Sequence, residues 1–566
     1  MLIQTVKVNG FRNFLDSEIN FNEKTLVIGA NDVGKTNLIY ALRLLLDKSL
    51  SDRDIEPEIT DFHINSTGTQ SDNFSIEIHF SNITEDAVLA TLKGNVSDEG
   101  NTIFKLVADK ETLDYQVLIG ASTEELEVVP NRFYLKYINM RYVRSRRDLQ
   151  KFINSEKKHL LKLSQNNLEE AEKTEDQKEM NRISRGLDVI NKRVARLNYV
   201  KDSTSAVNDE LKKLAYASAD YSVQLDSGAI KVSQFIENLE LGASTSGTKL
   251  MLGGDGRNNQ ILLALWKAKS QREFDPAYEV TFYCVEEPEA HLHPHQQRKL
   301  ADYLINQLPG QTIITSHSPQ IAERYSPDSI VNIINKGGGS RASSNGCSSC
   351  ISDAWDNLGY RMSILPAEAF FSNCVILIEG PSEKLFYHEL ANAVGFDLDF
   401  YNISILCVDG IQFEVYANIL NALEIPWVMR TDNDVSKVPY KAEKNLAGIN
   451  RCQKLANLPE FPRQPGATIA HDTLTNGTWQ LASDNVNPKG IFLSKIDLEN
   501  DLALEMAEEL KAYSGKADTE SAVKYIQAKK AIRMREFLST YRGDLPKLIS
   551  GELAKPLAFA VAKVMS

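Results

Sequence analysis

Hydrophobic and polar residues alternate along the start of the chain in a way that predicts strands before a helix. The stretches LIQTVKV (2–8) and SEINF (17–21) repeat with a period of two, which is typical of half-buried strands. The apolar run TLVIG (25–29) predicts a buried strand. It leads through a turn into TNLIYALRLLLD (36–47), whose apolar residues recur at helical spacing. The first fifty residues are therefore expected to form strands, a turn and a helix.

The same analysis predicts further strands in both halves of the chain. Their sequences are FSIEIHF (74–80), FYLKYINM (133–140), VTFYCV (280–285), CVILI (374–378), ISILCV (403–408) and IPWVMR (425–430). One helix is predicted to begin at about residue 382 and another to end at about residue 423. Most of the last fifty residues are also predicted to be helical. Because strands alternate with helices in the C-terminal part, we expect a second α/β domain there.

Two stretches differ in composition from the rest. Residues 148–235 begin with a charge-rich segment that lacks proline and has apolar residues at three-and-four spacing, which predicts long solvated helices in an insertion. Residues 337–350, GGGSRASSNGCSSC, are rich in Gly and Ser and predict a linker. We expect domains at 1–345 and 369–566, with 148–235 as an insertion that serves oligomerisation and a linker at 346–368.

The composition excludes several classes of protein. The 566 residues suffice for about three or four domains. Six cysteines are too few for a disulfide scaffold, no apolar run is long enough to span a bilayer, and no export signal begins the chain. We expect a cytoplasmic protein. Its net charge of −13 argues against coating nucleic acid through bulk positive charge, but not against a local basic patch or a carboxylate-based nuclease.

A phosphate-binding motif stands between the predicted strand 25–29 and the predicted helix. Residues 29–36, GANDVGKT, fit the pattern G-x-x-x-x-G-K-[ST]. The glycines let backbone N–H groups curl round phosphate oxygens at a helix N-terminus. Lys35 would reach the β- and γ-phosphates and Thr36 would hold Mg²⁺. A chance match in a turn is the alternative, which the flanking elements disfavour.

Two later strands end in residues that suit a nucleotide site. VTFYCV runs into Glu286 and Glu287, of which the first would lie beside the metal and the second would polarise an attacking water. The strand in IITSHSPQ (313–320) leads to His317, placed to touch a γ-phosphate, although a lone histidine after a strand is more often structural. Weak indications of zinc come from His291, His293 and His295, and from the pair Cys347 and Cys350.

Acidic residues follow three consecutive strands of the second domain. They are Glu379 with Glu383 in the first helical turn, Asp409, and Asp432 with Asp434. Ligands of α/β folds bind at the carboxyl ends of parallel strands, so these carboxylates should gather at one edge. Clustered carboxylates would repel one another unless a divalent metal neutralised them, so the chemistry requires Mg²⁺ or Mn²⁺. Asp497 and Glu499 alternate again in FLSKIDLENDL (492–502).

These motifs resemble two known families. The phosphate-binding loop followed by Asn37, its long separation from Glu286 and the run EEPEAHLHP resemble ABC-type ATPases of the SMC and OLD class. In that class a signature element precedes the acidic strand and contacts the nucleotide of a second subunit. Residues 253–257, GGDGR, are the candidate, although they depart from the usual Ser-Gly-Gly-Gln. Strands ending in Glu, Gly and D-x-D resemble the Toprim fold of topoisomerases, primases and OLD nucleases.

The combination is the architecture of the OLD (overcoming lysogenization defect) family. The motifs NGFRNF, LIEGPSEK, RTDND, GINRC and IDLENDL bring the resemblance closer to the nuclease subunits of Gabija antiphage systems. The implied fold class is α/β. It comprises an ABC/SMC-type P-loop ATPase domain with a helical insertion, followed by a Toprim domain with a helical C-terminal extension.

The resemblance implies a Mg²⁺-dependent DNA endonuclease, nicking or double-strand cleaving, that is regulated by nucleotide binding. In such sites a lysine near the C-terminus stabilises developing negative charge. Lys530 is preferred over Lys529 for this role. The alternative interpretation is that both are solvated lysines on a helix. The implied catalytic positions are Glu379, Glu383, Asp432, Asp434, Asp497, Glu499 and Lys530, and the six acids are also the implied metal ligands. The implied ATP-binding positions are Gly29, Asn31, Gly34, Lys35, Thr36, Asn37, Glu286, Glu287 and His317.

The resemblance also implies partners. They are double-stranded phage DNA, a GajB-like helicase subunit and further copies of the chain, in a tetramer built through the insertion and ATPase domains. Arg141, Arg144, Arg146 and Arg147 form the densest basic cluster, which suits either DNA phosphates or acids of the insertion. Two other functions stay open, a housekeeping OLD-type repair exonuclease and a non-nucleolytic SMC-like ATPase clamp on DNA.

Overall fold

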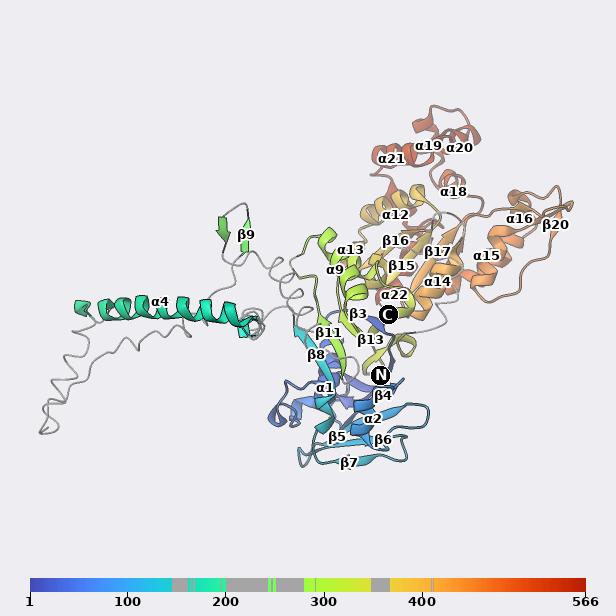
Figure 1. Cartoon of the computed structure of the whole chain (residues 1–566). Coiled ribbons are helices and arrows are strands. Elements are labelled where there is room, and N and C mark those ends of the chain that lie inside the picture. Colours follow the sequence, from blue (N-terminus) through green and yellow to red (C-terminus); the bar gives the residue numbers. More distant parts are fainter. Residues whose placement is uncertain are drawn as a thin grey trace, which may run out of the picture. The chain divides into compact units, whose positions relative to one another are not determined.

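The structure is a computed structural model (Figure 1). It describes residues 1–144, 168–194, 196–199, 279–290, 292–347, 367–408, 410 and 412–565, and the short pieces 161–162, 164–165, 243–245 and 248–250. The contacts divide the chain into two units, one of residues 1–143 with 275–566 and one of residues 144–274. Among the described helices, none has the length and apolar content needed to cross a membrane.

The first sheet is antiparallel throughout. Its strands are β1 (Leu2–Phe11), β2 (Phe14–Asn20), β4 (Asn73–Ser81), β5 (Thr102–Asp109), β6 (Tyr115–Gly120) and β7 (Glu127–Val129), in the order β2-β1-β4-β5-β6-β7. The alternating stretches that predicted strands at 2–8, 17–21 and 74–80 all lie in this sheet. Their apolar faces are buried on one side, which explains the period of two.

The second sheet carries the phosphate-binding loop. Its strands are β3 (Lys24–Gly29), β8 (Ile138–Arg144), β11 (Val280–Glu286), β12 (Thr312–Thr315), β13 (Ile330–Lys336) and β14 (Gly339–Ala342), in the order β14-β13-β3-β12-β11-β8. The neighbours β13, β3, β12 and β11 run parallel. Every residue of β11 is buried, as its unbroken apolar run predicts.

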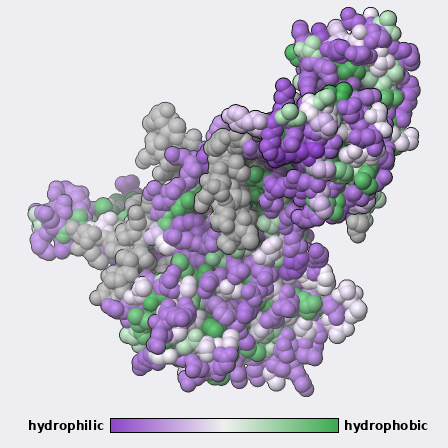
Figure 2. Space-filling view, turned by 90° about the vertical axis from the view of Figure 1, so that its right-hand side faces the viewer, coloured by the Kyte–Doolittle hydropathy of each residue, from purple (hydrophilic) through white to green (hydrophobic). Residues whose placement is uncertain are grey.

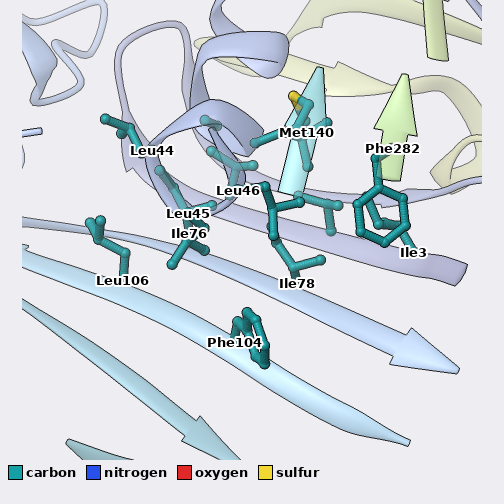
Figure 3. Close-up of a cluster of buried hydrophobic side chains, with 14 of the residues drawn as sticks. Ile3, Leu44, Leu45, Leu46, Ile76, Ile78, Phe104, Leu106, Met140 and Phe282 are labelled. Carbon is teal, nitrogen blue, oxygen red and sulfur yellow. The ribbon is translucent and has the colours of Figure 1, made fainter. Parts of the chain in front are cut away.

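Helix α1 (Lys35–Leu46) joins the two sheets through one hydrophobic core. Figure 3 shows Leu45 and Leu46 of α1 next to Ile76 and Ile78 of the antiparallel sheet. The same core includes apolar residues of β3, β11, β12 and β13 in the parallel sheet. Burial of both faces of α1 therefore fixes the helix whose N-terminus receives the phosphate-binding loop.

The linker predicted at 337–350 is wrong for its first part. Gly337 and Gly338, with φ of 69° and 88°, form the turn between β13 and β14, in which Lys336 pairs with Gly339. Two consecutive glycines with positive φ are what a tight β-hairpin requires, so the same composition that indicates a linker here makes a turn. The strand predicted at 133–140 is also displaced. Residues Phe133–Lys136 form a 3-10 turn in which the hydroxyl of buried Tyr134 donates to the carbonyl of Leu45, and β8 begins only at Ile138.

The third sheet is parallel and lies in the C-terminal part of the chain. Its strands are β15 (Cys374–Ile378), β16 (Ile403–Cys407), β17 (Trp427–Thr431) and β21 (Ile491–Leu493), in the order β16-β15-β17-β21. The strands predicted at 374–378, 403–408 and 425–430 are thus confirmed within two residues. Helices α12 (Pro381–Val394), α13 (Leu398–Tyr401) and α14 (Phe413–Ala422) connect the strands.

The C-terminal helices complete the core of this sheet. They are α18 (Leu498–Glu505), α19 (Ala507–Ser514), α20 (Thr519–Gln527), α21 (Lys530–Thr540) and α22 (Lys555–Met565). Apolar residues of these helices and of β15 and α12 form a single buried cluster. The helical C-terminal extension is therefore part of the domain core. Between β17 and β21 lie a small antiparallel sheet of β18 (Ser436–Lys437), β19 (Glu443–Asn445) and β20 (Gln464–Pro465), and the helices α15 (Ala447–Leu455), α16 (Ala470–Thr475) and α17 (Thr478–Val486).

The remaining elements are short or belong to the second unit. In the first unit they are α2 (Asp86–Leu92), α9 (Pro294–Gln307) and α10 (Pro319–Ala322). In the second unit, helix α4 (Glu170–Val194) is exposed along most of its length, so the prediction of solvated helices is confirmed for this part of 148–235. The strands β9 (Ala243–Thr245) and β10 (Thr248–Leu250) pair antiparallel. The molecular face in Figure 2 is mainly hydrophilic, with apolar residues in small scattered groups.

A charged cluster on the antiparallel sheet gives a test of this register. Glu77 on β4 accepts a hydrogen bond from His79 (2.7 Å) and pairs with Lys105 on β5 (2.9 Å). The hydrogen bond from His79, with that from Lys105, lowers the pKa of Glu77 to about 2. Because its ordinary value is near 4.3, the stabilisation is complete above about pH 5 and is lost as the pH falls towards 2. The free energy of unfolding of Glu77→Gln should therefore lie below that of the wild type at pH 6, with the gap narrowing by pH 3. A gap of constant size would contradict the paired register.

Candidate functional site

The phosphate-binding loop closes round Lys35 at the start of α1. Gly29 and Gly34 adopt φ of 146° and 100°, and a Cβ on Gly29 would lie 2.5 Å from the carbonyl oxygen of Ile333. The Lys35 ammonium donates to the carbonyls of Gly29 (3.0 Å) and Ala30 (2.7 Å). Burial lowers the pKa of Lys35, while the nearby carboxylates of Glu287 and Asp32 oppose that shift. The loop thus holds a cation at a helix N-terminus, which is an anion-binding arrangement.

The acidic strand end and the histidine reach the same place. Glu286 ends β11, is buried, and accepts a hydrogen bond from the hydroxyl of Tyr142, while its Oε1 has no partner. His317 Nε2 lies 3.5 Å from Glu287 Oε1, and burial, together with the charge of Lys35, lowers the pKa of His317. The structure therefore brings Lys35, Glu287 and His317 together, and Glu286 precedes Glu287 at the end of β11.

Two residues of this site were missed in the sequence. Glu289 accepts hydrogen bonds from the hydroxyl of Ser316 (2.8 Å) and the N–H of His317 (2.7 Å), and burial raises its pKa. It therefore fixes the turn that carries His317. Arg12 donates to the side-chain oxygen of Asn37 (3.0 Å). Both residues lie in motifs that were recognised in the sequence, Glu289 in the EEPE run and Arg12 in NGFRNF. Neither motif indicates which group the side chain contacts.

Two cavities flank the loop. One of about 750 Å³ is lined by Gly29, Ala30, Asn31 and His317 on the loop side, and by residues of the third sheet's domain on the other. The second, of about 470 Å³, is lined mainly by polar residues, among them Arg12, Asn13 and Asn37. Thr36 is exposed on the first turn of α1. The loop itself thus lines the first cavity, while the second, polar cavity lies beside Asn37, the residue that follows the loop.

The carboxyl edge of the third sheet gathers the predicted acids. Glu379 follows β15, Asp432 and Asp434 follow β17, and Asp497 lies just beyond β21 as the N-cap of α18. Parallel neighbours place these strand ends at one edge, as expected. Asp409 lies outside the described residues.

Glu379 is held by three neighbours. Its Oε1 accepts hydrogen bonds from the hydroxyl of Thr431, the N–H of Asp432 (2.8 Å) and the guanidinium of Arg451 (2.9 Å). The other arm of Arg451 lies 3.1 Å from Asp434 Oδ2. Arg451 thus bridges carboxylates from two strand ends and is itself largely buried.

Arg451 reaches this position because α15 lies against the backbone of the acidic segment. A Cβ on Gly448 would lie 2.2 Å from the carbonyl oxygen of Asp432, and the Gly448 N–H donates to the carbonyl of Asp434 (3.0 Å). Only glycine permits this approach. The sequence shows the glycine and the arginine in GINRC but not their contact.

A second arginine, Arg430, is buried in the middle of the acids. It lies 2.9 Å from Glu383 Oε1 and 2.9 Å from Asp501 Oδ2. The second oxygen of Glu383 accepts from the N–H groups of Glu379 (2.7 Å) and Gly380 (3.2 Å). Burial raises the pKa of Glu383, and Arg430 opposes that shift. Both oxygens of Glu383, a predicted metal ligand, therefore accept hydrogen bonds from protein groups in this structure.

The pKa values of the remaining acids and of Lys530 depend on burial and on one another's charges. Burial and the charges of Glu383 and Glu379 raise the pKa of Asp432 to about 8. Burial also raises the pKa of Glu499, whose Oε1 has no hydrogen-bond partner. Although burial acts to lower it, the pKa of Lys530 is raised, because Glu499, Asp432, Asp497 and Glu379 all stabilise its charge. The structure thus brings Lys530 into the range of the acids.

The donor chemistry suits a divalent cation, although the ligands are not arranged as a finished site. Among the described residues, no group of three Asp, Glu, His or Cys side chains forms a ready metal-binding arrangement. The acids offer hard oxygen donors, one of them the unpartnered Oε1 of buried Glu499. Arg430 and Arg451 occupy the places between carboxylates, so they supply the positive charge in this structure.

Several predicted residues lie outside the described part. They are 253–257, the side chain of Arg144, Arg146, Arg147, His291 and Cys350. Arg141 lies in β8, and His293 is the N-cap of α9. His295 bonds to Arg298 (2.7 Å).

Comparison with known proteins agrees with this arrangement. The family described as "AAA domain, putative AbiEii toxin, Type IV TA system" matches residues 24–323, which is more than half of the chain. The family described as "Overcoming lysogenization defect protein-like, TOPRIM domain" matches residues 370–434. The fold class expected from the motifs is thereby confirmed.

Two relatives match along most of the chain. Endonuclease GajA of Bacillus cereus (strain VD045) is 25% identical over 573 residues, 95% of either chain. The OLD nuclease of Thermus scotoductus (strain ATCC 700910 / SA-01) is 22% identical over 470 residues, 78% of this chain and 84% of the relative. Among solved structures, the SmcHead bound to the C-winged helix domain of ScpA matches 60% of this chain and 97% of its own, with 16% identity and a TM-score of 0.37.

The buried Arg430 makes a prediction about stability. Arg430→Met leaves Glu383 and Asp501 buried without a cation, which should lower the free energy of unfolding by about 3–5 kcal/mol. The matched control is Arg463→Met, which removes an exposed ion pair with Glu443 and should cost less than about 1 kcal/mol. Urea unfolding measures both. Equal losses in the two variants would show that Arg430 does not neutralise the buried acids.

Proposed function

Because the chain belongs to the OLD family of nucleases, in which an AAA-type ATP-binding domain precedes a Toprim domain, we propose that it is a divalent-metal-dependent DNA endonuclease regulated by nucleotide. The observation that carries the proposal is the gathering of acids and Lys530 at the carboxyl edge of the third sheet. The nucleotide would bind at the loop of residues 29–36.

Charge balance supports the use of divalent ions. Among the residues that the structure describes, the cluster contains seven carboxyl groups, those of Glu379, Glu383, Asp432, Asp434, Asp497, Glu499 and Asp501. It contains three cations, Arg430, Arg451 and Lys530. Three cations leave four negative charges in excess if all these groups ionise. Burial, and then the charges of Glu383 and Glu379, raise the pKa of Asp432. Two divalent cations, Mg²⁺ or Mn²⁺, would neutralise the excess charge.

The residues divide into ligands and supports. Glu379, Glu383, Asp432, Asp434, Asp497 and Glu499 would hold the metal, which supplies an activated water and charge stabilisation for phosphodiester hydrolysis. Lys530 would stabilise negative charge on the leaving oxygen. Arg451 and Arg430 act as positioning residues, because they set the separation of Glu379 from Asp434 and of Glu383 from Asp501.

The first test removes one charge from the acidic edge. Glu379→Gln keeps the size of the side chain and should reduce Mg²⁺-dependent cleavage of supercoiled plasmid by at least about a hundredfold, since the ligand set loses a central member. Glu414→Gln, which removes an exposed partner of Lys454, is the control and should cut at the wild-type rate. Retained cutting by Glu379→Gln would place the chemistry elsewhere.

The geometry also supports regulation by the nucleotide. Gly29 of the loop pairs with Ile333 on β13, and the neighbouring Asn332 donates to the carbonyl of Leu423 in the Toprim domain (2.8 Å). Arg341 on β14 forms a bidentate pair with Glu424 (2.8 and 2.6 Å). The loop is therefore connected to the nuclease domain through β13, which pairs with Gly29 and contacts Leu423. Nucleotide shifts activity only if it binds the competent and incompetent states with different affinity.

The second test separates regulation from chemistry. Lys35→Ala should abolish the effect of ATP on cleavage while leaving the cleavage rate without nucleotide unchanged. Plasmid cleavage with and without ATP measures both, and Lys48→Ala, an exposed lysine just after α1, is the control. Simultaneous loss of nucleotide dependence and of basal cutting by a folded Lys35→Ala protein would overturn this division of labour.

We further propose that the substrate is double-stranded phage DNA and that the protein acts in antiphage defence, in the cytoplasm, with a GajB-like helicase subunit. The match to Endonuclease GajA over 95% of either chain favours this role. The match to an OLD nuclease supports the second candidate, a repair exonuclease. A homotetramer built through the 148–235 insertion and the ATPase domain, with domains at 1–345 and 369–566, completes the proposal.

A further inference from the structure

A small hairpin projects directly from the acidic edge. The chain leaves Asp434, forms β18, turns at 438–442 and returns through β19 to Gly448. The Gly448 N–H donates to the carbonyl of Asp434 (3.0 Å), so both ends of the hairpin are tied to a predicted metal ligand. We call residues 435–446 the basic hairpin. It lies in the orange segment of Figure 1 that also carries α15 and β20.

The basic hairpin is firmly supported. The Val438 N–H donates to the carbonyl of Glu443 (3.0 Å) across the turn, and β20 adds a third strand beside β19. Buried Asn450 of α15 donates to Asn445 (2.8 Å) and exchanges hydrogen bonds with the backbone of Phe461. The hairpin is therefore fixed to the helix that positions Arg451.

Two positive charges of the basic hairpin face each other, which is unfavourable for the stability of the folded protein without a ligand. Lys437 and Lys444 are direct partners across β18 and β19, and like charges in that position destabilise a strand pair. Within the described residues neither lysine, nor Lys441 at the turn, forms an ion pair in this structure. The one acid of the hairpin, Glu443, pairs with Arg463 (3.4 Å). A positive patch, in which Lys437 and Lys441 are exposed and Lys444 is half-buried, thus stands on a chain of net charge −13.

An exposed aromatic residue stands at the tip. Tyr440 is fully exposed and its backbone φ is 63°, a conformation that L side chains other than Asn and Asp rarely adopt. Packing does not account for a large aromatic ring in this position. Aromatic rings stack on nucleobases, and such contacts tolerate any base sequence.

We propose that the basic hairpin is a DNA-binding element, in which Lys437, Lys441 and Lys444 contact backbone phosphates and Tyr440 stacks on an unpaired base beside the duplex. The inference rests on the proposed nuclease function and extends it. An acidic edge repels a polyanionic substrate before metal ions bind, so a positive element beside the edge favours the approach of the strand being cut. Six residues of extended chain reach about 20 Å, so these contacts lie within about six base pairs of the bond that is cut.

The test measures DNA affinity as a function of salt. All proteins carry Glu379→Gln so that DNA is bound and not cut, and fluorescence anisotropy reports binding, in Mg²⁺, of a labelled 30-base-pair duplex with a ten-nucleotide single-stranded extension. The test variant adds Lys437→Gln, Lys441→Gln and Lys444→Gln. The matched control adds Lys48→Gln, Lys299→Gln and Lys516→Gln, three exposed lysines outside the hairpin. A duplex RNA of the same sequence forms a second arm.

The hairpin variant should bind DNA at least about tenfold more weakly than the control, and the slope of log K against log[salt] should fall by about 2 to 3. Tyr440→Ala should weaken binding by about tenfold without changing that slope, and Tyr440→Phe should restore it. Equal affinities and slopes in the hairpin and control variants, while both bind DNA, would overturn the hairpin proposal. A hairpin effect seen with RNA alone would contradict the choice of DNA. Absence of both DNA binding and cutting in the wild type would instead overturn the proposed nuclease function.

Discussion

The guanidinium of Arg430 lies between the carboxylates of Glu383 and Asp501, and the Toprim half of the molecule depends on this contact. A buried charge is costly unless it is paired and hydrogen-bonded. Arg430 belongs to β17, Glu383 to the first turn of α12 and Asp501 to α18, so a single side chain ties the sheet to two helices. Since Asp432 follows Arg430 by two positions, the same contact fixes where the acidic segment emerges.

Neutralisation explains why the acids can fold together at all. Arg430 neutralises carboxylates at the base of the cluster. Arg451 does the same at the rim, because it lies between Glu379 and Asp434. Burial, together with the charges of Glu383 and Glu379, still raises the pKa of Asp432 to about 8, although Arg430 opposes that shift. The acidic edge keeps an excess of negative charge while its side chains are held in place. These side chains therefore lose little further conformational entropy when a small cation binds, which favours binding.

Much of this fold follows from local patterns. About half of the strands of the three larger sheets and helix α1 were predicted, because buried parallel strands are apolar runs and the glycine motif marks the turn between them. The strands that were not predicted are β5, β6, β7, β13, β14 and β21. The gathering of Glu379, Asp432 and Asp497 followed from topology. What failed has a physical cause in each instance. Glycines 337–338 form a hairpin turn whose composition equals that of a linker, and Tyr134 closes a 3-10 turn through a carbonyl far away in sequence. Arg430, Arg451 and Glu289 act through pairs that no spacing reveals, although a lone arginine at the end of the apolar strand β17 was a usable signal.

The position of β17 links the two halves of the proposal. Its amino end follows Glu424, which Arg341 of the ATPase sheet grips through two hydrogen bonds, and its carboxyl end carries Arg430 and then Asp432. Five residues of extended strand span about 17 Å and resist bending, because both neighbours β15 and β21 pair with it. Under the proposed regulation, a displacement of β13 beside the phosphate-binding loop would be passed to β17 through these contacts. Regulation at a distance requires that this connection have two discrete arrangements which the nucleotide binds with different affinity.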